Sequence, residues 1–192
     1  LTSDRALGAR ALLQEGRALL RLPDHDDALR ALGDVVQHHP HDSTQAASAL
    51  FLLAGEDADR GDDRGARRRW GELARRYPAD RLAPPARFQA DIISFVRREF
   101  RRAARGFDSL RVPDAGVAEA NAAGYWSGRA WAAGGDTDTA RMRWREVLDR
   151  APGSYYAGAS ARQLGIAAPP IREPGPPTPM PGWWMCENGW LF

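Results

Sequence analysis

The sequence has few of the residues that cross-links, membrane spans or a charged partner would require. Its 192 residues include one cysteine, Cys186, so no disulfide can form within the chain. No apolar run approaches the roughly 18 residues of a membrane-spanning helix. Lysine is absent, which we attribute to a GC-rich genome rather than to a demand for guanidinium groups. The formal net charge of +2 provides no overall attraction to nucleic acid.

The sequence also lacks the patterns of a catalytic or cofactor site. It contains no nucleophile–base pair, phosphate-binding loop or metal-ligand spacing. Four histidines lie among acidic residues and leave a metal site as an alternative: His25, His38, His39 and His41. We favour polar loop residues, because a histidine near a helix C-terminus is stabilised by the helix dipole. We therefore expect no catalytic residue, no bound metal and no cofactor.

A repeated apolar pattern dominates the rest of the chain. From Ala140, apolar residues recur at offsets 4, 7, 8 and 11, and a proline follows at offset 12. The same register starts at Ala66, and again at Ala28 with a histidine at its last position. This spacing places the apolar residues on one face of a helix, which the proline then ends. Three copies in one register indicate a repeat protein.

The repeats predict a stack of helical hairpins. We expect the hairpins to turn near residues 22, 61, 98 and 135, with prolines 40, 78, 113 and 152 following their second helices. These prolines are 38, 35 and 39 residues apart, which suits hairpins that bury their apolar faces on one another. The predicted fold is all-α: a right-handed α-solenoid of about four hairpins plus a terminal helix, over residues 3–166.

The composition changes at the C-terminal end. Residues 167–192 contain half of all the prolines and finish in the aromatic segment GWWMCENGWLF. A proline-rich stretch cannot be helical and is typical of an extended or polyproline-like chain. We therefore predict a proline-rich linker and an aromatic tail that is extended or disordered. Because the sequence starts at Leu1, a processed form, a fragment and an incomplete sequence all stay open.

The residues of the second helices resemble a known repeat. The pattern Ala-x3-Trp-x2-[Val/Leu]-x4-Pro is similar to the tetratricopeptide repeat. Twelve residues before each first alanine stands a small residue, as in that repeat: Gly16, Ala54 and Gly128. Trp131 matches its usual aromatic position. The resemblance covers about residues 6–153 and implies tetratricopeptide-like hairpins.

A second resemblance is narrower. The segment YWSGRAWAAGGDTDTARMRWREVLDRAPGSYYAGASARQLG, residues 125–165, is similar to the end of the superhelical scaffold of soluble lytic murein transglycosylases. That family has a downstream catalytic glutamate, typically followed by serine, but no Glu-Ser dipeptide occurs here. The resemblance therefore implies a non-catalytic scaffold in the bacterial periplasm or cell envelope. An enzymatic function would need the gene to continue beyond Phe192.

Two functions follow from these resemblances. In the first, the scaffold positions peptidoglycan strands or partner proteins. In the second, the chain is a stand-alone tetratricopeptide adaptor for protein–protein interaction in envelope assembly or cell division. Neither function involves nucleic acid or a transmembrane segment. The sequence leaves the ligand, the organism and the oligomeric state open.

Candidate binding and structural residues follow from the repeat register. Two basic helices present a candidate surface for an anionic partner, unless their charges pair with nearby acids: Arg68, Arg69, Arg97, Arg101 and Arg102. The tryptophans of the repeats are candidates to stack on sugars, but we favour packing roles for them. The tyrosine pair is expected to lock the last helix onto the fourth hairpin. The predicted structural positions are Ala28, Ala66, Trp70, Gly128, Trp131, Ala140, Trp144, Tyr155 and Tyr156.

Overall fold

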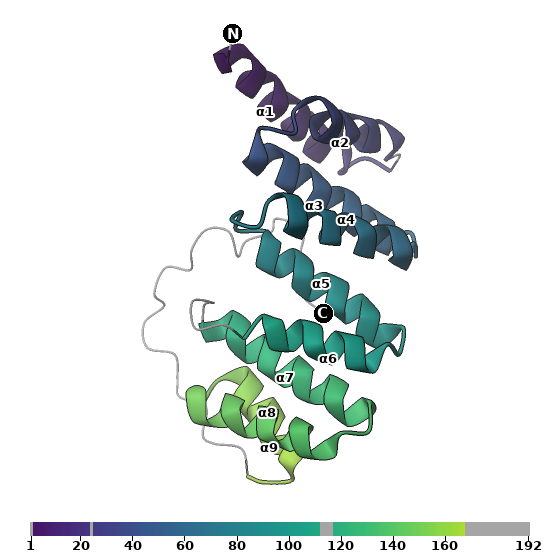
Figure 1. Cartoon of the computed structure of the whole chain (residues 1–192). Coiled ribbons are helices and arrows are strands. Elements are labelled where there is room, and N and C mark those ends of the chain that lie inside the picture. The colour runs from purple at the N-terminus through teal and green to yellow at the C-terminus, as the bar shows by residue number, and fades with distance from the viewer. Residues whose placement is uncertain (1, 24, 112–116, 168–192) are drawn as a thin grey trace.

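The computed structural model describes residues 2–23, 25–111 and 117–167, and the side chains of all of these except residues 2–6 and 117. Within these ranges the chain forms nine α-helices and no β-strand, stacked in chain order (Figure 1). The helices are α1 (Thr2–Leu19), α2 (Asp26–His38), α3 (Ser43–Asp59), α4 (Asp63–Arg76), α5 (Ala83–Val96), α6 (Phe100–Ser109), α7 (Val117–Ala133), α8 (Thr137–Arg150) and α9 (Tyr155–Leu164).

Each helix packs on the next one along the chain, so α1–α2, α3–α4, α5–α6 and α7–α8 form four hairpins and α9 covers the last of them. The turns within the hairpins lie between these helices, where the sequence predicted them. The predicted fold class, an all-helical tetratricopeptide-like solenoid, is confirmed. No helix in the described part of the chain is both long and apolar enough to cross a membrane. The predicted linker and tail after residue 167 lie outside the described residues.

Two of the turns are built from the same pair of residue types. Gly61 and Gly135 adopt φ values of +79° and +90°, which glycine adopts without steric cost. Each is followed by an aspartate, Asp62 or Asp136, whose Oδ1 accepts a hydrogen bond from a backbone N–H three residues on, at 2.9 or 3.0 Å. These aspartates cap helices α4 and α8 and satisfy N–H groups that have no partner within the helix.

The turn between α5 and α6 departs from this pattern. Arg98 takes the glycine position with a φ of 62°, and Glu99 takes the capping position without capping the helix. Instead, the Glu99 carboxylate accepts a hydrogen bond of 2.6 Å from Arg67 of α4. The hydrogen bond from Arg67 lowers the pKa of Glu99. Glu99 therefore connects the second hairpin to the third and does not cap helix α6.

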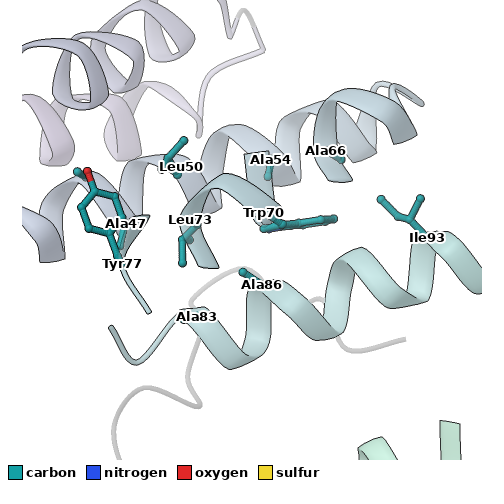
Figure 2. Close-up of a cluster of buried hydrophobic side chains, with 11 residues drawn as sticks. Ala47, Leu50, Ala54, Ala66, Trp70, Leu73, Tyr77, Ala83, Ala86 and Ile93 are labelled. Atoms are coloured by element: carbon teal, nitrogen blue, oxygen red, sulfur yellow. The ribbon is translucent and has the colours of Figure 1, made fainter. Parts of the chain in front are cut away.

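The second helices present one large side chain to the core at a fixed position. Leu32, Trp70, Phe107 and Trp144 are each at most 5% exposed and follow one another at intervals of 38, 37 and 37 residues. Figure 2 shows Trp70 of α4 between α3 and α5. The terminating prolines are less regular because α6, with 10 residues, is shorter than the 14-residue α4 and α8. Core packing, rather than helix length, therefore sets the period.

Small residues of the first helices make room for these core side chains. A Cβ on Gly16 would lie 2.7 Å from the Leu32 side chain, and one on Gly128 would overlap the Trp144 indole. The equivalent position of the third hairpin holds Asp91. Its carboxylate fills the space over Gly106 of α6, where a Cβ would overlap it. In the third hairpin, the small residue of this contact therefore lies on the second helix instead of the first.

Candidate functional site

The odd-numbered helices form the more tightly curved side of the stack. Among the described helices, α1 touches α3 and α7 touches α9. Between these, the rings of Phe95 on α5 and Trp126 on α7 meet at a centroid distance of 5.5 Å. When alternate helices of a solenoid approach on one side, that side becomes concave and provides an extended binding surface. We call the part formed by α5, α7 and α9 the inner face.

A continuous row of aromatic rings crosses the inner face. From Phe95 and Trp126 it continues to Tyr125, 5.9 Å from Trp126, and then to Tyr156, 5.6 Å from Tyr125. Tyr155 ends the row, 5.2 Å from Tyr156. The first four rings are partly buried, whereas Tyr155 is 72% exposed. The row therefore combines rings fixed by packing with an apolar end that is open to solvent.

Arg129 lies at the centre of this row. Its guanidinium carbon is 5.8 Å from the Phe95 ring centroid, 6.0 Å from that of Tyr125 and 5.5 Å from that of Trp126. Its Nη1 donates a hydrogen bond of 3.3 Å to the Tyr125 hydroxyl. Cation–π contacts of this kind hold a guanidinium plane in one place. Tyr125, Trp126 and Arg129 share one side of α7 because residues separated by three or four positions are neighbours on a helix.

The predicted structural residues lie mostly in the core. Ala28, Ala66 and Ala140 are 0% exposed, and Trp70 and Trp144 are 5% exposed, so these two tryptophans have no ring face available for a sugar. Gly128 lies under the Trp144 indole, whose Nε1 donates a hydrogen bond of 3.2 Å to the backbone oxygen of Tyr125. Trp126 and Trp131 are only partly buried.

The exposure of Tyr155 does not support the locking role expected of it. Its ring lies 5.2 Å from that of Tyr156, and the residue is 72% exposed. Both tyrosines open α9, and neighbouring helical residues point about 100° apart, so only one of them can face α7. Tyr156 packs on Tyr125 of α7, and this is the ring contact between α9 and the fourth hairpin among the described residues.

Trp131 belongs to a polar network that joins α6, α7 and α8. The carboxylate of Asp108 accepts hydrogen bonds from Ser127 at 2.7 Å, from Trp131 at 3.0 Å and from the Arg143 guanidinium at 2.8 and 3.2 Å. Burial by itself would raise the pKa of Asp108, but the hydrogen bonds outweigh burial and lower it. Arg111 completes the network by pairing with Asp108 at 3.0 Å. Because its groups are satisfied by one another, we assign this network to stability rather than to binding.

The five arginines predicted to bind an anionic partner lie on or just before the even-numbered helices. Arg69 pairs with Asp57, Arg97 approaches Asp63 and Glu99 at 3.5 and 3.7 Å, and Arg102 approaches Glu99 at 3.5 Å. Arg68 and Arg101 are exposed and form no ion pair among the described residues. Arg97 and Arg102 therefore lie close to Glu99, whereas Arg68 and Arg69 lie on α4. The basic surface stays a prediction, with two of its five charges unpaired.

Three of the four histidines, His25, His38 and His39, each lie near a single carboxylate. His25 Nδ1 lies 2.7 Å from Glu56, and His39 Nδ1 lies 3.7 Å from Asp42. No three potential metal ligands gather anywhere in residues 2–23, 25–111 and 117–167. These contacts connect neighbouring helices and turns.

Residues 122–154, which cover most of the α7–α8 hairpin, match the tetratricopeptide repeat family. The fold is similar to the crystal structure of MamA, with 18% sequence identity and a TM-score of 0.56. That similarity covers 79% of this chain and 85% of MamA. No curated protein matches the chain in sequence. The similarities support a tetratricopeptide-type helical scaffold, and at this sequence identity the likeness to MamA concerns the fold.

Proposed function

We propose that this chain is a non-catalytic scaffold that binds an extended segment of a partner protein on its inner face. The observation that carries the proposal is the row of aromatic rings around Arg129, which runs across three successive odd-numbered helices. A tetratricopeptide-type stack presents such a surface over several repeats. The function is that of an adaptor for protein–protein interaction.

The composition of the inner face suits protein binding. Aromatic residues and arginine dominate the energetically important centres of protein interfaces. Tyr155 at the start of α9 is 72% exposed, which adds apolar surface at one end of the row. Contiguous exposed apolar surface next to polar groups marks interaction sites.

A display selection with a library of random short peptides tests the proposal, with the full chain as bait. Tyr155→Asp places a charge in the row at an exposed position. The matched control is Met142→Asp, since Met142 is also an exposed apolar residue, at 47%, but lies on α8. We expect Tyr155→Asp to weaken the selected peptides at least about tenfold and Met142→Asp to leave them unchanged. Equal binding by the two variants would reject the inner face as the site.

The second candidate is a scaffold that positions peptidoglycan in the bacterial envelope. It is favoured by the similarity of residues 125–165 to the scaffold of lytic murein transglycosylases. Arg68 and Arg101, two of the five predicted binding arginines, are exposed and form no ion pair in the described structure, so their charges are open to an anionic polymer. Sedimentation with purified sacculi tests this candidate. We expect binding that weakens with added salt and with the double change Arg68→Gln and Arg101→Gln.

A further inference from the structure

We infer that the segment bound on the inner face is acidic, and that one of its carboxylates pairs with Arg129 beside an apolar residue that packs on Tyr155. This inference rests on the proposed function and adds the chemistry of the partner. It is carried by the surroundings of one side chain.

Arg129 is the exception among the partly buried arginines of the described structure. Five arginines there are partly buried, and four of them pair with carboxylates. The four pairs are Arg67–Glu99, Arg69–Asp57, Arg111–Asp108 and Arg143–Asp108. Arg129 has aromatic rings and a hydroxyl as its neighbours, with no described carboxylate within 4.0 Å. Withdrawing a charge from water without a partner is costly, so the arrangement favours a carboxylate from another molecule.

The charge balance of the inner face points the same way. Helices α5, α7 and α9 carry three arginines, Arg87, Arg129 and Arg162, and two acids, Asp91 and Glu119. Asp91 packs over Gly106 of α6. Glu119 precedes Arg129 by 10 residues, or about 15 Å along the helix axis. Neither acid therefore neutralises Arg129.

The rings around Arg129 favour a carboxylate that comes with apolar neighbours. A guanidinium offers planar, paired N–H donors that match a carboxylate. Its attraction to a carboxylate strengthens where the surroundings are less polar than water, and the rings of Phe95, Tyr125 and Trp126 lie within 6.0 Å of the Arg129 guanidinium carbon. Along the row, Tyr155 presents an exposed ring for the next apolar side chain of the ligand. We therefore expect an extended segment with aspartate or glutamate close to an aromatic or aliphatic residue.

The peptides selected by display on the full chain provide the probe. We expect them to share an acidic residue near an apolar one. For the tightest peptide, we expect Arg129→Met to weaken binding about tenfold or more, because methionine keeps contact with the rings and removes the charge. Changing the acidic residue of the peptide to its amide should reduce the affinity by a similar factor. The two changes combined should reduce the affinity little more than either change alone. Arg129→Lys should lie between the wild type and Arg129→Met.

The matched control is Arg105→Met, which removes an exposed arginine from α6. It should leave the affinity unchanged, and all variants should keep the helical circular dichroism of the wild type. The inference would be overturned if the selected peptides were neutral. It would also be overturned if both Arg129 variants bound with full affinity while Tyr155→Asp weakened binding. In either case the proposed function would still stand. If no peptide is enriched, or if binding is independent of Tyr155, the proposed function fails and the inference fails with it.

Discussion

The carboxylate of Asp91 on α5 packs directly over the backbone of Gly106 on α6. The other hairpins hold glycine or alanine at the position of Asp91. Burial raises the pKa of Asp91 from 3.8 to about 7, although the charges of Arg102 and Arg87 act in the opposite direction. The third hairpin thus has a carboxylate at a position where the other hairpins have a glycine or an alanine.

This contact predicts that stability depends on pH. Between about pH 4 and about pH 7 the folded protein binds the Asp91 proton more tightly than the unfolded chain does. The resulting stabilisation is complete below the unfolded pKa and is lost as the pH rises through the folded pKa. We expect the wild type to lose about 1–2 kcal/mol over this range, after allowance for partial exposure of the group.

Urea unfolding at about pH 5 and about pH 8 measures this loss. Asp91→Asn should remove most of it and be more stable than the wild type at the higher pH. Asp149→Asn changes an exposed carboxylate on α8 and should follow the wild type. A parallel pH dependence of Asp91→Asn and the wild type would contradict the expectation.

The turn before α6 offers a stabilising substitution. Arg98 has a φ of 62°, a conformation that costs a side-chain-bearing residue roughly 1–2 kcal/mol. Glycine removes this strain but loses more backbone entropy on folding, by about 0.5–1 kcal/mol. Arg98→Gly should therefore raise the free energy of unfolding by about 0.5 kcal/mol.

Chemical denaturation checks this gain. Gly135→Ala is the reverse change at the equivalent turn, where φ is +90°, and should be destabilising by about 1 kcal/mol. Destabilisation by Arg98→Gly would mean that contacts of the arginine outweigh its backbone strain.

Trp144 is expected to stabilise the fold rather than to bind a ligand. It is 5% exposed, covers Gly128 and donates a hydrogen bond to the backbone oxygen of Tyr125. Trp144→Ala should cost about 3–5 kcal/mol. Arg101→Ala, at an exposed position, should stay within about 0.5 kcal/mol of the wild type. Thermal unfolding of both variants measures the difference, and full stability of Trp144→Ala together with loss of ligand binding would reverse the two roles.

The chain by itself is expected not to cleave peptidoglycan. The lytic murein transglycosylases, to which a resemblance of residues 125–165 is proposed, use a glutamate typically followed by serine, and this dipeptide is absent from the sequence. Incubation of the purified chain with sacculi should release no anhydro-muropeptides, while a lytic transglycosylase assayed in parallel does. Release that persists after repeated purification would refute the expectation.

Local patterns in the sequence determined the helices, the turns and the buried faces. Apolar spacing placed Ala28, Ala66 and Ala140 on the buried side of their helices, because burial of one helix face follows from local periodicity. Gly61 and Gly135 marked two turns because a left-handed residue there favours glycine. These features depend on residues within a few positions of one another, so one sequence is enough to find them.

Only the tertiary structure decided which charged side chains have an ion-pair partner and which do not. Arg67 and Glu99 are 32 residues apart, and Arg143 and Asp108 are 35 apart, so their pairing depends on how neighbouring hairpins pack. Local sequence patterns do not single out Arg129, because the rings around its charge come from two helices, α5 and α7, and Phe95 is distant from Arg129 in the sequence. The exposure of Tyr155 follows equally from the orientation of α9 on α7. Periodicity shows which face of a helix is buried, but the contacts between distant helices determine which polar groups have a partner.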